Sequence, residues 1–204
     1  MLKLPTVTLC AVTSIKLPET IAVMRDAMSK VRFSRATIVT NVAQYHLRWG
    51  YDDKEAYRYC DELKSLSDYS QYVFHNRPFY TPHVLYIQHD ARLVNPDAWT
   101  DEFLQYDYIG APWPPGHITP EIVVGNGGFS LRSSKLVDTI QALGLTLNTP
   151  PYDNEDVNIC YNHRAILERH GIRFAPPALA ARFSRELPLP AEYEQGTPFG
   201  THKR

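Results

Sequence analysis

Short apolar runs rich in β-branched and aromatic residues recur along the chain. The runs at 6–13, 36–41 and 83–87 are bounded by polar residues or proline, a pattern that predicts buried strands. After Pro18, which suits a helix start, apolar side chains recur at helical spacing: Ile21, Met24, Ala27, Met28 and Val31. A strand, a helix and a strand in this order predict a parallel sheet with right-handed crossovers.

The predicted elements are shorter in the second half of the chain, where prolines and glycines are frequent. Ser133 or Ser134 is expected to cap one helix, and residues 153–156 another helix that runs to Gly171. No element is assigned to 49–67. The other expected elements are a helix beginning near Asp68, a turn with a short helix at 95–99, a strand at 106–113, a loop at 116–121 and a strand at 172–175.

The length of the chain, 204 residues, suits one well-buried domain and is too short for two comfortable ones. The composition, 44% hydrophobic and 21% charged, is that of an ordinary globular protein. We therefore expect a single α/β domain over residues 1–204, with a central, mostly parallel sheet flanked by helices. The tail at 187–204 contains several prolines and glycines and is expected to wrap around the surface.

Charge and cysteine content narrow the class of protein. A formal net charge of −1 gives no electrostatic reason to expect a nucleic-acid partner, and the arginines gathered after residue 163 are interpreted as solvated positions. Three widely spaced cysteines provide neither a disulfide framework nor a CxxC metal site. The N-terminus has no signal-peptide pattern, and no stretch approaches the ~20 apolar residues of a membrane span. We expect a cytoplasmic protein.

Asp90 is the first candidate functional residue, because it follows the predicted strand at 83–87 directly. Open α/β sheets bind their ligands at the carboxyl ends of the strands. A glycine-rich segment at 125–128 and an acidic helix start at 154–156 come later in the chain. Each feature also has a structural explanation, since a strand-end Asp caps turns, glycines form tight turns and acids favour a helix N-terminus. Together and in this order they indicate an enzyme that handles an activated sugar.

Several motifs carry a resemblance to a known family. They are Tyr86–Asp90, Asn95–Trp99, Tyr108–Trp113, Gly125–Arg132, Glu155–Val157, Phe174–Pro177 and Pro198–His202. With these motifs the chain resembles a bacterial and viral glycosyltransferase-like family that was long catalogued only as a domain of unknown function. More broadly, it is similar to the GT-A class of nucleotide-sugar-dependent glycosyltransferases.

The resemblance implies a divalent metal cofactor, Mn²⁺ or Mg²⁺. GT-A enzymes hold the metal with an Asp-x-Asp motif, and the metal neutralises charge on the donor diphosphate. Here the motif is Gln88-His89-Asp90, so Asp90 is the candidate ligand and Gln88 replaces the first Asp. That departure leaves open a looser metal site or metal-free catalysis by Arg or Lys. His202 resembles the late histidine that several GT-A enzymes bring to the metal, and Arg92 is expected to pair with the diphosphate or with Asp90.

The resemblance also suggests residues for the donor and the acceptor. The end of the first strand would contact the nucleotide, and the glycine segment with its neighbours would line the sugar and acceptor. The donor set is Val12, Thr13, Ser14, Gln88, Asp90 and Arg92, and the sugar and acceptor set is Trp113, Asn126, Gly127, Gly128 and Phe129. Asp156, or Glu155 in its place, would be the general base of an inverting transfer. A retaining enzyme would need no such base.

The function expected from the sequence is the transfer of a sugar from a nucleotide-sugar donor to an acceptor hydroxyl. A glycan is the favoured acceptor, and a nucleic-acid base stays conceivable. The alternative is a non-catalytic carbohydrate- or nucleotide-binding module with a degenerate metal site, which the Gln88 departure favours. A nucleotidyltransferase would normally have a glycine-rich, basic loop after the first strand, and residues 13–16 do not form one. The donor sugar, the acceptor and the oligomeric state stay open.

Overall fold

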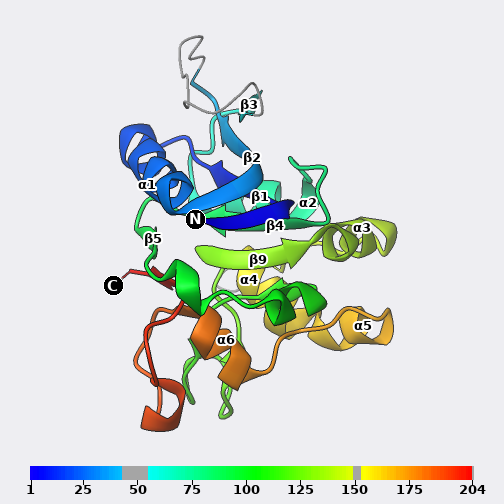
Figure 1. The fold of residues 1–204 in the computed structure, drawn as a ribbon. Coiled ribbons are helices and arrows are strands. Elements are labelled where there is room, and N and C mark those ends of the chain that lie inside the picture. Colours follow the sequence, from blue (N-terminus) through cyan, green and yellow to red (C-terminus); the bar gives the residue numbers. More distant parts are fainter. Residues whose placement is uncertain (43–54, 149–152, 204) are drawn as a thin grey trace.

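A six-stranded sheet forms the centre of the protein in the computed structural model, which describes residues 1–42, 55–148 and 153–203 (Figure 1). Its strand order is β3-β2-β1-β4-β9-β6. The first four of these strands are parallel, and β9 runs antiparallel to both β4 and β6. The strands are β1 (Leu2–Val12), β2 (Val31–Thr40), β3 (Glu55–Tyr59), β4 (His83–Ile87), β6 (Tyr108–Ile109) and β9 (Phe129–Ser133). The predicted α/β class with a mostly parallel central sheet is confirmed.

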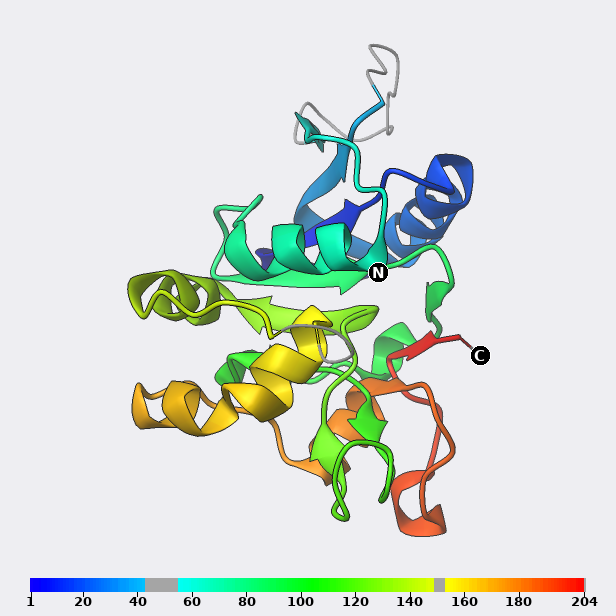
Figure 2. The same ribbon diagram turned by 180° about the vertical axis from the view of Figure 1, so that it is seen from behind.

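Helices cover both faces of this sheet. One face, with Leu9 and Ala11 of β1, packs against α1 (Leu17–Lys30). The other face, with Cys10 and Val12, packs against α2 (Leu66–His75) and α3 (Ser134–Ala142). Figure 2 shows α2 lying in front of the strands on this second face. The alternation of side chains along β1 therefore supplies both halves of the core.

The predicted helix starts agree with the structure to within two residues. In α1 the four apolar positions from Ile21 to Met28 are buried as expected, whereas Val31 begins β2. The second helix begins at Leu66, two residues before the predicted start, because Ser65 and Asp68 form a reciprocal capping box. Ser133 caps α3 as predicted, with its hydroxyl accepting a hydrogen bond from the Leu136 N–H.

Two strands predicted in the second half need correction. The expected strand at 106–113 is divided at Gly110, whose Cβ position is filled by the carbonyls of Gly125 and Asn126. Its two parts are β6 and β7 (Pro112–Trp113), and β7 pairs with β8 (Val123–Val124) in a separate small sheet. The expected strand at 172–175 is reduced to one bridge between Phe174 and Tyr108.

The predicted helix from 153 to 171 is divided into three pieces. These are α4 (Glu155–Val157), a π-helical turn (Asn158–Asn162) and α5 (Arg164–Arg169). The His163 N–H bonds to the Asn158 carbonyl, which widens the helix by one residue at this point. The segment left unassigned at 49–67 contains β3 and the start of α2, and its residues 49–54 lie outside the described ranges.

The end of the C-terminal tail is a strand in the core rather than a surface wrap. In a second, three-stranded sheet, β11 (Gly200–His202) lies between β10 (Ser184–Arg185) and β5 (Ala91–Leu93). Phe199 is fully buried just before it, with its ring centroid 5.0 Å from that of Trp99, 5.8 Å from Phe183 and 5.9 Å from Phe129. This aromatic cluster anchors the strand that carries His202.

The remaining described elements are short. They are α6 (Pro177–Phe183) and the 3₁₀ turns η1 (Pro96–Ala98), η2 (Asp101–Gln105) and η4 (Ala191–Tyr193), of which η1 lies in the turn predicted at 95–99. Residues 116–121 form a loop, as expected. Among the residues that the structure describes, no helix has the length and apolar character needed to cross a membrane.

Replacing Phe199 by alanine should lower the free energy of unfolding by about 3–5 kcal/mol, because the change leaves a cavity among three aromatic rings. Denaturant unfolding followed by tryptophan fluorescence measures the loss. The matched control, Tyr161→Ala, removes a ring that is 50% exposed and should change stability by less than about 0.5 kcal/mol. Equal effects of the two substitutions would contradict the anchoring role of Phe199.

Candidate functional site

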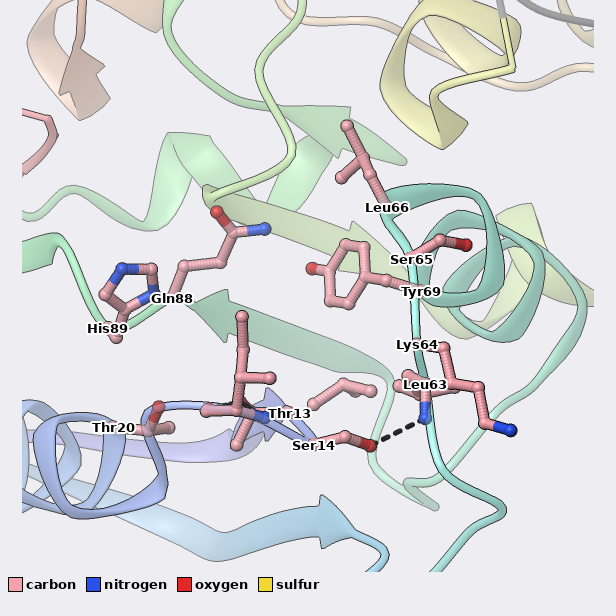
Figure 3. Close-up of a pocket in the computed structure, with 12 residues that line it drawn as sticks. Thr13, Ser14, Thr20, Leu63, Lys64, Ser65, Leu66, Tyr69, Gln88 and His89 are labelled. Atoms are coloured by element: carbon pink, nitrogen blue, oxygen red, sulfur yellow. Dashed lines mark hydrogen bonds between the residues drawn. The ribbon is translucent and has the colours of Figure 1, made fainter.

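A cavity of about 280 Å³ opens at the carboxyl ends of β1 and β4, which are parallel neighbours in the sheet. Four residues predicted to bind the donor line this cavity: Val12, Thr13, Ser14 and Gln88. Its other lining residues are Ile15, Thr20, Leu63, Lys64, Ser65, Leu66, Tyr69 and His89. In Figure 3, Thr13 and Ser14, just beyond the end of β1, lie on one side of this space, and Leu66 and Tyr69 of α2 lie on the opposite side. The structure thus brings these four of the six predicted donor-binding residues together around one concave space, whereas Asp90 and Arg92 do not line it.

The start of α2 forms one wall of the cavity, and the sequence did not predict this wall. Ser14 holds this wall in place, because its hydroxyl accepts a hydrogen bond of 2.8 Å from the Leu63 N–H (Figure 3). Ile15 and Leu66 are 67% and 61% exposed and add large apolar side chains to the lining. The Ser-x-x-Asp pattern at 65–68 indicates a helix start, but nothing in it says that this helix faces the end of β1.

Gln88, Asp90 and His202 meet beside this cavity. Strand β11 pairs His202 with Ala91 of β5, and the Lys203 N–H donates to the Asp90 carbonyl. As a result His202 Nε2 lies 3.2 Å from Asp90 Oδ1 and 3.1 Å from Gln88 Oε1. The Asp90 side chain is 32% exposed, so it is neither turned into the interior nor closed off from solvent. Two residues that the sequence nominated as metal ligands are therefore in contact.

The donor set of Asp90 and His202 fits a divalent metal. Asp90 Oδ1 is buried, and within the described residues no donor reaches it with hydrogen-bond geometry, although His202 Nε2 is close. Two ligands bound at right angles, each about 2.1 Å from an ion, lie about 3 Å apart. No group of three or more His, Cys, Asp or Glu in ranges 1–42, 55–148 and 153–203 forms a fuller metal cluster. Mg²⁺ in nucleotide enzymes commonly takes few protein ligands and completes its shell with substrate phosphates and water.

Glu186 is a further member of this cluster that the sequence did not single out. Its Oε1 lies 3.1 Å from His202 Nδ1, and its Oε2 accepts a 2.6 Å hydrogen bond from the Asn126 side-chain amide. Burial raises the pKa of Glu186, but the hydrogen bonds and charge of His202, together with Asn126 and Lys203, lower it overall. Glu186 is therefore an ionised carboxylate, and no motif or spacing in the sequence around it marks it.

The glycine segment is explained by close packing as well as by a turn. Asn126 supplies the positive φ, at 58°, and its side chain is held by Glu186. A Cβ at Gly127 would overlap the Glu155 carboxylate, and a Cβ at Gly128 would overlap the His202 ring. Glycine is needed at both positions because the Glu155 and His202 side chains pack directly against the backbone.

Trp113 and Phe129, both predicted to contact sugar or acceptor, are buried in the structure. Trp113 is 3% exposed, and a Cβ at Gly125 would overlap its ring. Phe129 is fully buried and packs against Phe183 and Phe199. The Trp113 ring thus packs against Gly125 and the Phe129 ring belongs to the aromatic cluster around Phe199, so contact of either ring with sugar or acceptor is not seen in this structure.

Glu155 and Asp156 are adjacent but have different environments. Glu155 forms a buried ion pair of 2.9 Å with Arg132, whose guanidinium lies between the rings of Tyr86 and Tyr108. That pairing occupies Glu155, so Asp156 is the better placed of the two for a base. Asp156 is half-buried, and its two oxygens accept 2.8 Å hydrogen bonds from the N–H groups of Gly127 and Val157.

The pKa of Asp156 is shifted towards neutrality. Burial and then the nearby Glu155 charge raise the pKa of this carboxyl to about 7, although the Gly127 N–H and Arg132 partly oppose the rise. A carboxyl group with a pKa near the working pH suits general acid–base catalysis.

Arg92 lies apart from the other candidate residues. Its guanidinium donates to the carbonyls of His89 and Ala91 and faces a shallow cavity beside Glu19 and Asp26 of α1. No ion pair joins it to Asp90 within the described residues. Of the two alternatives for Arg92, the pairing with Asp90 is not found in this structure, and the pairing with the diphosphate stays a prediction.

Comparisons with known proteins identify a family for the sequence and similar structures for the fold. A family model described as "Protein of unknown function (DUF5672)" matches residues 58–202. No curated protein matches the sequence. The structure is similar to that of a glycosyltransferase involved in the glycosylation of the major capsid of PBCV-1, with a TM-score of 0.54 and 13% identity over 97% of this chain and 92% of that one.

A second similar structure is the mannosyltransferase PcManGT from Pyrobaculum calidifontis in complex with GDP-Man and Mn²⁺. The TM-score is 0.52 and the identity 12%, over 85% of this chain and 55% of that one. The present chain thus spans about half the length of the mannosyltransferase. At these identities the comparisons show a shared fold, and the activity has to be argued from the site itself.

Glu155→Gln should lower the free energy of unfolding by about 3–5 kcal/mol, because it leaves the buried Arg132 charge unpaired. The matched control is Glu168→Gln, which breaks an Arg–Glu contact of the same 2.9 Å length at a site where the side chains are 29% and 47% exposed. The control should cost less than about 1 kcal/mol. Chemical denaturation of both variants measures the difference, and similar losses would contradict the structural role of Glu155.

Proposed function

Since the chain belongs to the DUF5672 family of unknown function and shares its fold with glycosyltransferases, we propose that it transfers a sugar from a nucleotide-sugar donor to an acceptor hydroxyl. One observation carries this proposal: the glycine segment connects all parts of the candidate site. The Gly128 carbonyl accepts from the Gln88 N–H beside the cavity, Gly128 packs against His202, and the Gly127 N–H donates to Asp156. Donor cavity, candidate metal ligands and candidate base therefore adjoin one another.

The cavity at the ends of β1 and β4 would hold the nucleoside part of the donor. Its apolar side chains suit the faces of a base, and the hydroxyls of Thr13 and Ser14 add polar groups at the strand end. The diphosphate would then lie towards Asp90 and His202, past Gln88. A divalent ion held by these two residues would neutralise the charge that develops on the leaving diphosphate. Binding of GDP-Man and Mn²⁺ by the similar mannosyltransferase supports this assignment.

Asp156 would act as the general base. As the acceptor oxygen attacks the anomeric carbon, its proton passes to a carboxylate oxygen of Asp156, and the bond from the anomeric carbon to the diphosphate oxygen breaks. The bonding electrons leave with the diphosphate, and the configuration at the anomeric carbon inverts. The Gly127 and Val157 N–H groups hold the carboxylate in place through this step.

The alternative is a binding module without catalysis, favoured by the single carboxylate in Gln88-His89-Asp90. Titration of a panel of nucleotide sugars with and without Mn²⁺ separates the two functions. Metal-dependent donor binding with slow donor hydrolysis supports the transferase. Binding that ignores Mn²⁺, with no hydrolysis or transfer for any donor, would establish the module instead.

Asp156→Asn should lower kcat by about 10²- to 10⁴-fold, because the amide cannot take the proton of the acceptor. Donor affinity, measured by calorimetry, should stay near that of the wild type. Asp138→Asn is the control, since Asp138 pairs with Arg77 in an exposed ion pair; it should leave kcat unchanged. Undiminished transfer by the Asp156 variant would rule out its role.

The rate of transfer should rise as the pH increases through about 7, the raised pKa of Asp156. Below this pH the carboxyl group is protonated and cannot accept a proton, whereas above it the carboxylate form dominates. A kcat profile measured at saturating donor and acceptor checks the expectation. The residual activity of Asp156→Asn should lack this step, and a step retained by that variant would assign the titration to another group.

A further inference from the structure

We infer that Glu186 positions His202 for the metal by holding the proton of its imidazole on Nδ1, so that the Nε2 lone pair is directed at Asp90. This inference rests on the proposed function, because it concerns the same metal site. Glu186 lies against the His202 ring, with its Oε1 3.1 Å from Nδ1, and would act on the metal through that ring. It is therefore a positioning residue.

The hydrogen bonds of Glu186 determine where this proton lies. A carboxylate only accepts hydrogen bonds, and Glu186 Oε2 is filled by the Asn126 amide at 2.6 Å. Its Oε1 lies 3.1 Å from His202 Nδ1 and accepts the ring N–H, whereas Lys203 Nζ is farther from this oxygen, at 3.8 Å. The Asn126 amide nitrogen also lies 2.9 Å from Nδ1, but a charge-assisted bond to a carboxylate is about twice as strong as a neutral one.

The other ring nitrogen faces a second carboxylate, and geometry decides between the two. Glu186 Oε1 meets Nδ1 with hydrogen-bond geometry at 3.1 Å, whereas no donor among the described residues reaches Asp90 Oδ1 with such geometry, although Nε2 lies 3.2 Å from it. Gln88 Oε1, 3.1 Å from Nε2, is a neutral acceptor and forms a weaker bond to the ring N–H than a carboxylate does, which favours the proton on the Glu186 side. Asp90 Oδ1 and Gln88 Oε1 then lie 3.2 Å and 3.1 Å from Nε2, which carries the ring lone pair. Two oxygen donors that both face one nitrogen donor create a place for a cation.

The backbone holds this arrangement in place from three sides. Strand β10 pairs in parallel with β11, Arg185 opposite Thr201, which sets Glu186 beside His202. The Arg185 guanidinium binds the carbonyls of Glu194 and Gln195 and so fixes the chain next to Glu186. Gly128, by lacking a Cβ, leaves room for the imidazole ring. A carboxylate that orients a metal-bound histidine is a common feature of metal sites, and its loss typically weakens metal binding.

Glu186→Gln on the full chain is the test, since the side chain keeps its size and loses its charge. Mn²⁺ alone is titrated and free Mn²⁺ followed by electron paramagnetic resonance. Affinity should fall roughly 10- to 100-fold, while the melting temperature of the metal-free protein stays that of the wild type. Glu192→Gln, the same change at an exposed position of the tail, should leave the affinity unchanged. Unchanged affinity in Glu186→Gln would overturn the inference.

Nitrogen NMR of ¹⁵N-labelled histidine gives a second readout that needs no metal. With a neutral imidazole, His202 should carry its proton on Nδ1 in the wild type and on Nε2 in Glu186→Gln, where the amide would donate to Nδ1. A proton on Nε2 in the wild type overturns the role of Glu186 alone. Wild-type protein that binds no Mn²⁺, or a His202→Gln variant that binds it as tightly as the wild type, overturns the metal site of the proposed function instead.

Discussion

The buried ion pair between Arg132 and Glu155 is the interaction on which the candidate site depends. The two side chains are 1% and 4% exposed, and the guanidinium is 4.9 Å and 5.1 Å from the ring centroids of Tyr86 and Tyr108. Charges this deep are tolerated only when they are paired and hydrogen-bonded. Strand β9, which carries Arg132, must therefore meet the start of α4, which carries Glu155. As a consequence, the next residue, Asp156, lies where its carboxylate accepts a hydrogen bond from the Gly127 N–H.

The same constraint accounts for the glycine segment. The backbone at 127–128 passes between the Arg132–Glu155 pair and the His202 ring, and a methyl group at either position would collide with one of them. The turn before it uses Asn126 in a left-handed conformation, stabilised by the hydrogen bond to Glu186. Strain and close packing are thus concentrated where the metal and the acceptor would lie, as is usual at functional sites.

The candidate site is assembled from distant parts of the chain by two sheets. The parallel order of β1 and β4 places Thr13 beside Gln88 at one sheet edge. The antiparallel pairing of β11 with β5 then brings the end of the tail back to Asp90. Because the aromatic cluster around Phe199 anchors β11, packing in the core and the geometry of the candidate metal ligands are coupled.

Local pattern was enough to predict the parallel sheet, the face of α1 and the position of Asp90 at the end of β4, because hydrophobic periodicity acts over neighbouring residues. The resemblance to glycosyltransferases supplied His202 and Asp156 as candidates, and the structure places His202 against Asp90 and Asp156 against the glycine segment. Only the tertiary structure separated Glu155 from Asp156, adjacent acids whose difference lies in which one meets Arg132. It alone revealed Glu186, the α2 wall of the cavity and the divisions of the segments at 106–113 and 153–171. These features depend on which remote side chains and carbonyls come into contact, and no local spacing encodes that.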